Sequence, residues 1–161
     1  MRIIVGVTGA SGVIMSYCLL QALREFQDCE VHLVASKAAR VTWKYETDMP
    51  FSALASLADA VYEEDELTAL IASGTFVTEG MIVLPCSMKT LAGIVCGYAE
   101  NLLLRAVDVC LKENRKVVLC PREMPLGRIH LHNMELAAQY GCTVIPPMLT
   151  FYNGAQTVED Q

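Results

Sequence analysis

Hydrophobic residues recur along the chain in short β-branched runs that alternate with longer apolar stretches of helical length. The first run, Ile3 to Val7, is apolar on both faces, which is typical of a central strand in a parallel sheet. Further strands are expected at residues 30–35, 60–62, 81–85, 116–120 and 142–145. Helices are expected at residues 13–23, 37–45, 51–58, 91–96, 101–113 and 129–140. This alternation predicts an α/β fold with a single domain over residues 1–161, built on a doubly wound parallel sheet.

A glycine turn follows the first strand. Gly9 and Gly12 bracket the small residues Ala10 and Ser11, and an apolar stretch of helical length comes next. Amides at a helix start carry partial positive charge, so the turn is a candidate phosphate site to which the Ser11 hydroxyl adds a donor. The glycine spacing is not the G-x-G-x-x-G of dinucleotide folds, and close strand-to-helix packing is the alternative role for these glycines.

The stretch from Thr8 to Gly12 is similar to the corresponding turn of short-chain dehydrogenases, but two features argue against that family. The second strand ends in Ser36 and Lys37 rather than in the acid that grips an adenosine ribose. No Tyr has a Lys four residues later, the spacing that those enzymes use for proton transfer. A mononucleotide therefore fits better than NAD.

Two further polar clusters follow predicted strands. Ser87, Lys89 and Thr90 come after residues 81–85, and Arg122 and Glu123 come after residues 116–120. Ligands of open α/β sheets bind beyond the carboxyl ends of the strands, so both clusters are candidate ligand loops. The Arg122 guanidinium suits a phosphate, and Glu123 is a potential proton carrier. Helix capping in the first cluster and a structural Arg–Glu pair in the second are the alternatives.

Charged residues interrupt two other stretches. Arg105, Asp108 and Lys112 lie at i, i+3 and i+7 of an apolar helix and share one face, either as paired surface charges or as part of a site. The acidic run from Glu63 to Glu66 predicts the solvated start of a helix.

The chain is hydrophobic for a globular protein, with 53% hydrophobic residues and a mean hydropathy of +0.37. The uncharged stretch from Ile3 to Leu23 is of membrane-span length, but glycines and polar residues interrupt it as expected of a buried strand, turn and helix. We therefore expect no membrane segment and extensive contacts between copies of the chain.

Charge and cysteine content exclude several partners. The net charge is −6 and the 12 Lys and Arg form no basic block, which argues against nucleic acid. The seven Cys include no C-x-x-C pair, and His130 and His132 have no third ligand nearby. These features indicate a reduced, cytoplasmic protein with neither a disulfide framework nor a metal site.

Four motifs in order resemble those of the UbiX-type flavin prenyltransferases, including the type that accompanies bacterial aromatic-acid decarboxylases. The motifs are Gly9 to Gly12, Pro85 to Ile94, Arg105 to Val109 with Leu111 to Glu113, and Pro121 to Leu126. The match continues in Ile129 to Leu131 with Asn133 and Met134, and in Pro147 with Phe151 and Tyr152. The resemblance covers nearly the whole chain. It implies an FMN-binding, Rossmann-like subunit of the homo-oligomeric flavin-containing Cys decarboxylase superfamily, assembled as trimers within a dodecamer with each site at a subunit junction.

The resemblance also implies a reaction. A dimethylallyl group moves from dimethylallyl phosphate to N5 of reduced FMN without a metal ion, and ring closure at C6 follows. The product, prenylated FMN, serves a separate UbiD-type aromatic-acid decarboxylase. The sequence does not decide between the monophosphate and the diphosphate as prenyl donor.

Site residues follow by position from the same resemblance. Arg105, Lys112 and Tyr152 correspond to residues that hold the substrate phosphate. Catalytic roles fall to Glu123 as proton carrier, to Glu46 as an acid near the flavin, and to Ser11. Family members continue past the position of Gln161 with a helix that carries a further basic residue; either this sequence is incomplete or that residue is absent. The residues expected around FMN are Gly9, Ala10, Ser11, Ser36, Ser87, Met88, Lys89, Thr90 and Arg122.

Three other functions compete with this one. An FMN-dependent decarboxylase of peptidyl cysteine or phosphopantothenoylcysteine shares the fold, but it has an Asn-rich loop where this chain has residues 86–90. A direct aromatic-acid decarboxylase would need residues that hold a carboxylate against the flavin, apart from the phosphate ligands. A non-catalytic FMN-binding subunit of a decarboxylase complex is the third alternative.

Overall fold

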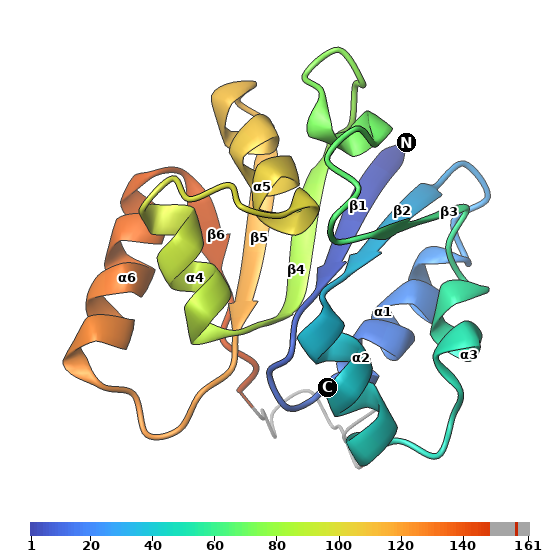
Figure 1. The fold of residues 1–161 in the computed structure, drawn as a ribbon, viewed down its shortest axis with the longest axis horizontal. Helices are drawn as coiled ribbons and strands as arrows, with labels where there is room; N and C mark the ends of the chain where they lie inside the picture. Colours follow the sequence, from blue (N-terminus) through green and yellow to red (C-terminus); the bar gives the residue numbers. More distant parts are fainter. Residues whose placement is uncertain (149–156, 158–161) are drawn as a thin grey trace.

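A six-stranded parallel sheet forms the centre of the computed structural model, which describes residues 1–148 and residue 157 (Figure 1). Its strand order is β3-β2-β1-β4-β5-β6, so the order reverses between β1 and β4. Such a reversal opens a crevice at the carboxyl ends of the two strands. The predicted doubly wound sheet is confirmed. The strands are β1 (Arg2–Val7), β2 (Glu30–Ala35), β3 (Ala60–Glu63), β4 (Gly80–Cys86), β5 (Lys116–Pro121) and β6 (Cys142–Val144).

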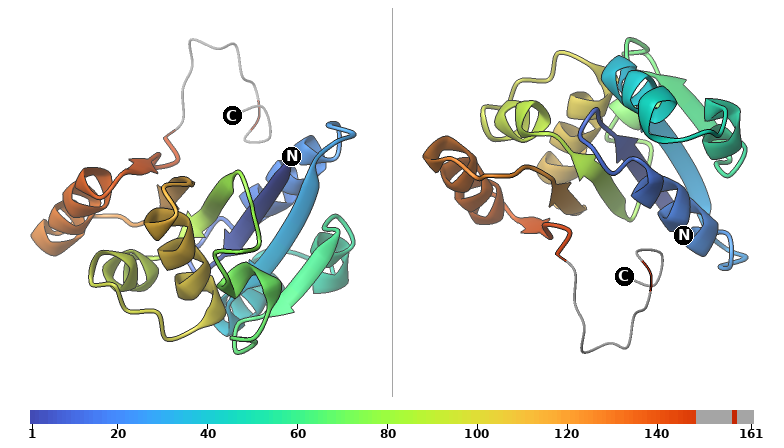
Figure 2. Two further views of the ribbon diagram at one scale, coloured as in Figure 1. Left: turned by 90° about the horizontal axis from the view of Figure 1, so that it is seen from above. Right: turned by 90° about the horizontal axis from the view of Figure 1, so that it is seen from below.

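Helices cover both faces of the sheet, and each layer has its own hydrophobic cluster (Figure 2). Because side chains alternate along a strand, Val5 and Val7 pack on one face of β1 while Ile4 packs on the other. On the first face lie α1 (Ile14–Leu23), α2 (Lys37–Glu46) and α3 (Phe51–Ala55). On the second lie η1 (Leu70–Ala72), α4 (Met88–Val95), α5 (Leu102–Lys112) and α6 (Arg128–Gln139).

The acidic run from Glu63 to Glu66 does not begin a helix, so that prediction was wrong. Glu63 ends β3, and residues 64–65 form a turn. Two basic side chains of α2 hold the run in place, since Arg40 pairs with Glu63 and Lys37 pairs with Asp65. Paired charges thus fix this segment, whereas the prediction rested on solvated carboxylates at a helix start.

Three findings bear on the membrane, disulfide and metal predictions made from composition. None of the helices in the described part is long and apolar enough to cross a membrane. All seven cysteines are free thiols. The described residues include no group of three or more His, Cys, Asp and Glu side chains placed to hold a metal ion.

Candidate functional site

Three loops meet at the carboxyl edge of the sheet, and hydrogen bonds join them. The buried Thr8 hydroxyl, directly after β1, donates to the Pro85 carbonyl at 2.7 Å and accepts from the Ser87 amide at 2.8 Å. The Arg122 amide, directly after β5, donates to the Cys86 carbonyl at 3.1 Å. The predicted convergence of the loops after β1, β4 and β5 is therefore confirmed.

The start of α2 completes this edge from the side of β2. The Ser36 amide donates to the Val7 carbonyl at 2.9 Å, and the Ser36 side chain caps α2 by accepting from the Ala39 amide at 3.0 Å. Gly9 lies so close to α2 that a Cβ on it would come within 2.5 Å of the Ala38 Cβ. Gly9 is thus needed for close approach of the turn to the helix.

A cleft of about 770 Å³ lies between the loops after β1 and β4 and the starts of α2 and α5. The N-termini of α2 and α4 both border it, each capped by a serine, and amides in the first turn of a helix have no partner within the helix. Two such N-termini suit a phosphate, and the volume falls in the range of small-molecule sites. The cleft therefore fits a mononucleotide such as FMN. Of the residues predicted to bind FMN, it is lined by Gly9, Ser36, Ser87, Lys89 and Thr90.

The remaining predicted FMN residues lie in the same loops but do not line the cleft. Ala10 and Ser11 are half-buried in the turn after β1. Met88 is the first residue of α4 and packs against the hydrophobic cluster under that helix. Arg122 is exposed at the start of the loop after β5.

An internal carboxylate, not an open cradle, lies at the start of α1. Glu46 accepts from the Gly12 amide at 2.8 Å and from the Val13 amide at 3.3 Å. Burial raises the pKa of Glu46, but hydrogen bonds from the Ser11 hydroxyl and these two amides, with the nearby charge of Arg122, outweigh burial and lower it. The two amides that were predicted to hold a phosphate thus donate to an acid 34 residues away from Gly12 in the sequence, and a phosphate at this turn stays a prediction.

Glu123 and Arg122 do not pair with each other in the described part of the chain. The Glu123 carboxylate accepts from the Met124 amide at 3.0 Å, and both side chains are exposed. The alternative of a structural Arg–Glu pair thus has no support. Both side chains are accessible from solvent at the carboxyl edge.

Arg105 and Lys112 lie apart from the other predicted site residues. Both belong to α5, which runs toward the amino ends of the strands (Figure 1). Arg105 donates through Nε to the Ala72 carbonyl at 3.3 Å, and Lys112 pairs with Glu113. Lys112 ends α5 just before β5 begins, so it lies at the edge of the sheet opposite the cleft. Tyr152 lies outside the described residues.

Several cleft residues escaped sequence reasoning. Two of them carried a local signal. Thr8 directly follows the first predicted strand, and Lys37 follows Ser36, the first residue after the second predicted strand. Glu64 and Asn101 carried none, since their contact joins distant segments. The Asn101 side chain lies 3.4 Å from the Glu64 carboxylate, and the Leu102 amide donates to the Glu64 carbonyl at 2.7 Å. This pair ties the end of β3 to the start of α5 and forms one wall of the cleft.

Comparison with known proteins agrees with this geometry. The flavoprotein family model matches residues 1–160. A probable UbiX-like flavin prenyltransferase of Sedimentibacter hydroxybenzoicus is 58% identical over all of this chain and 85% of the relative. The structure of a dodecameric FMN-dependent UbiX-like decarboxylase from Escherichia coli O157:H7 superposes with a TM-score of 0.96 at 53% identity, covering 99% of this chain and 86% of that one. AnUbiX in complex with FMN and dimethylallyl pyrophosphate superposes with a TM-score of 0.94 at 46% identity, covering 98% and 84%.

Proposed function

The chain belongs to the flavoprotein family and, within it, to the UbiX-like flavin prenyltransferases, and we propose that it joins a dimethylallyl group from dimethylallyl phosphate to reduced FMN. One observation carries the proposal: a cleft at the carboxyl edge of the sheet, bordered by two serine-capped helix N-termini. The complex of AnUbiX with FMN and dimethylallyl pyrophosphate supports FMN and a phosphorylated dimethylallyl donor as the ligands.

The residues of the cleft have distinct roles in this proposal. Ser36 and Ser87, with Lys89 and Thr90, hold the FMN phosphate at the starts of α2 and α4. Arg122 adds a charge beside the flavin, and Gly9 leaves room for it. When bound, reduced FMN supplies the nucleophilic N5 and the C6 at which the new ring closes.

Negative charge develops on the leaving phosphate as its bond to the prenyl carbon breaks, so the site needs groups that stabilise this charge. Arg105, Lys112 and Tyr152 stabilise the negative charge that develops on the phosphate oxygens. Glu123, exposed at the same edge as Arg122, moves a proton. Glu46 and Ser11 form a rigid pair beside the glycine turn and shape the flavin side of the site.

The site is completed by a neighbouring copy of the chain. Lys112 lies at the edge of the sheet opposite the cleft, so it reaches a substrate phosphate only in another subunit. Large apolar side chains near the site are open to solvent in a single copy, with Tyr45 85%, Met124 83% and Ile129 75% exposed, and subunit contacts would bury them. We infer trimers assembled into a dodecamer, which the dodecameric relative supports.

The product has a destination that we also propose. Prenylated FMN is handed to a UbiD-type aromatic-acid decarboxylase, because the Sedimentibacter relative is named as a flavin prenyltransferase, whose product is a modified flavin. The seven free thiols support a reducing, cytoplasmic location for this step.

An anaerobic assay tests the function. The purified protein is incubated with reduced FMN and dimethylallyl phosphate, and the flavin is then analysed by mass spectrometry. We expect the flavin to gain one prenyl group. Carbon dioxide released from an aromatic acid or a cysteinyl substrate by this protein alone would instead support a decarboxylase, and bound but unchanged flavin would support a non-catalytic subunit.

A further inference from the structure

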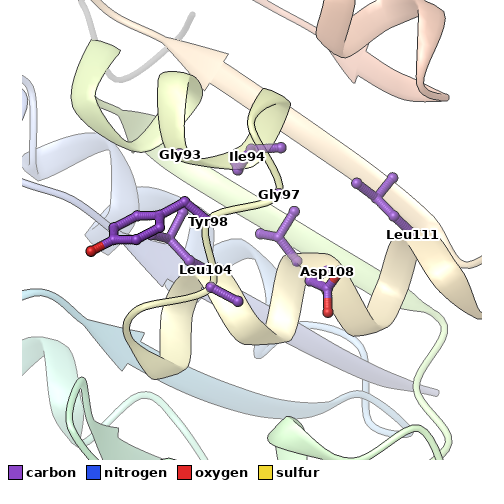
Figure 3. Close-up of a pocket in the computed structure, with 9 residues that line it drawn as sticks. Gly93, Ile94, Gly97, Tyr98, Leu104, Asp108 and Leu111 are labelled. Atoms are coloured by element: carbon purple, nitrogen blue, oxygen red, sulfur yellow. The ribbon is translucent and has the colours of Figure 1, made fainter.

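Arg105 is held on two sides within its own subunit. Its Nε donates to the carbonyl of Ala72 in η1 at 3.3 Å, and its Nη1 donates to the Asp108 carboxylate, one turn further along α5, at 2.5 Å. Figure 3 shows Asp108 projecting from α5, one of the residues that line a small cavity between α4 and α5. Neither Arg105 nor Asp108 is buried, with side chains 37% and 40% exposed.

These two contacts fix the plane of the guanidinium and occupy only some of its N–H donors. An arginine has five N–H donors in a rigid fork, and the contacts to Ala72 and Asp108 occupy one on Nε and one on Nη1. The donors that remain among the described contacts are those of Nη2 and the second on Nη1. These donors can pair with the oxygens of a phosphate.

The segment that receives Arg105 is itself held rigidly. Arg115 donates to the carbonyls of Gly74 and Phe76, and Arg2 donates to the carbonyl of Val77 at 3.0 Å. The Ala72 carbonyl therefore lies just before a segment, residues 74–77, that Arg2 of β1 and Arg115, directly before β5, hold in place. A rigid acceptor makes the orientation of Arg105 a property of the fold.

We propose that Asp108 is a positioning residue, which together with the Ala72 carbonyl presents the Arg105 guanidinium to the prenyl phosphate bound in a neighbouring copy. The inference rests on the function proposed above. Asp108 does not itself attract the phosphate, because its charge is negative. Its contribution is to restrain the long Arg105 side chain before the substrate binds, so that ordering this side chain costs less free energy on binding.

The test compares Asp108→Ala with Asp108→Asn in the complete oligomer, by initial rates of FMN prenylation at varied dimethylallyl phosphate. Asp108→Ala should raise KM for the prenyl phosphate roughly three- to tenfold, the cost of restraining one long side chain on binding. Asp108→Asn keeps an acceptor oxygen for Arg105 and should restore KM to within about twofold of wild type. In Arg105→Ala, adding Asp108→Ala should cause no further rise.

Controls separate positioning from stability. The affinity for FMN and the mass of the oligomer should be unchanged in both Asp108 variants. Glu135→Ala removes a matched acid on α6, whose carboxylate accepts from Gln139 one turn on, and should leave KM unchanged. If wild type prenylates FMN and Asp108→Ala lowers the melting temperature but not the affinity for prenyl phosphate, the positioning role is overturned. If wild type prenylates no flavin, the proposed function falls and this inference falls with it.

Discussion

The Glu46 carboxylate accepts a hydrogen bond from the Gly12 amide at 2.8 Å, and thereby the last residue of α2 caps the start of α1. Gly12 adopts a φ of +94°, which few residues other than glycine tolerate, and this turn aims its amide at the acid. The carboxylate of Glu46 thus occupies the start of α1. In the proposed function, the FMN phosphate binds instead at the starts of α2 and α4, which border the cleft.

Replacing Glu46 should make stability less dependent on pH. The pKa of Glu46 is lowered in the folded protein, because hydrogen bonds to Ser11, Gly12 and Val13 outweigh the effect of burial. A lowered pKa stabilises the fold above the unfolded-state value of about 4.3, and this contribution is lost as the pH falls through the folded-state value. Glu46→Gln should therefore unfold at lower urea concentration than wild type near neutral pH, and the difference should shrink below about pH 4.

Urea titrations at several pH values measure this difference. Glu25→Gln, which removes an exposed acid beyond the other end of α1, serves as the control. A gap between Glu46→Gln and wild type that stays constant down to the lowest pH would show that the carboxylate is not the source of the stabilisation.

Gly9→Ala should disrupt the contact between the glycine turn and α2. The added methyl would lie 2.5 Å from the Ala38 Cβ and 3.1 Å from the Ala38 carbonyl carbon, so the helix must shift. Overpacking of this kind costs about 1–3 kcal/mol of unfolding free energy, and we expect weaker FMN binding with it. The double variant Gly9→Ala with Ala38→Gly removes the closest clash and should recover part of both losses. Wild-type FMN affinity in Gly9→Ala alone would contradict this role.

Arg122→Ala should weaken retention of FMN. A charge-assisted hydrogen bond contributes about 1.5–3 kcal/mol, so the dissociation constant should rise at least tenfold. Quenching of flavin fluorescence measures it, and Arg128→Ala, an exposed arginine at the start of α6, is the matched control. Unchanged flavin content of the Arg122 variant after dialysis would mean that this residue does not contact the nucleotide.

Labelling of Cys96 should report the occupancy of the cleft. Cys96 is exposed and lines the cleft, whereas burial raises the pKa of Cys120 and of Cys142 to about 11 and keeps these thiols unreactive near neutral pH. A maleimide should label Cys96 readily in the free protein and more slowly once FMN is added. The rate at Cys18, outside the cleft, should not change with FMN. Equal rates at Cys96 with and without the nucleotide would place the flavin elsewhere.

The sheet was predictable because each strand carries its own signal. The run from Glu30 to Ala35 has the same bounds in the sequence and in the structure, since burial on both faces selects apolar residues at four of its positions, Val31, Leu33, Val34 and Ala35. The convergence of the loops after β1, β4 and β5 could be predicted from the strands, because parallel strands bring their carboxyl ends to one edge of the sheet. Local signals were weaker at helix ends, and α3 stops at Ala55, three residues before the predicted end.

Contacts between distant segments were not predictable in the same way. The hydrogen bond from Gly12 to Glu46 depends on how α2 lies across the turn, and no local pattern specifies it. The acidic run after β3 was assigned to a helix start because its partners, Lys37 and Arg40, lie more than twenty residues earlier. The sequence also placed Arg105 with Arg122 by resemblance, whereas in one copy they belong to different parts of the fold.

The central claim is that one reaction site is built from two copies of the chain, with FMN in the cleft of one and the prenyl phosphate against α5 of the other. Co-expression of two variants tests it directly. Arg122→Ala impairs the flavin side, Arg105→Ala with Lys112→Ala impairs the phosphate side, and each should make little prenylated FMN alone. Mixed oligomers should regain a substantial fraction of wild-type product by mass spectrometry of the flavin, because some sites then combine two intact halves. Mixed oligomers no more active than the separate variants would contradict the claim.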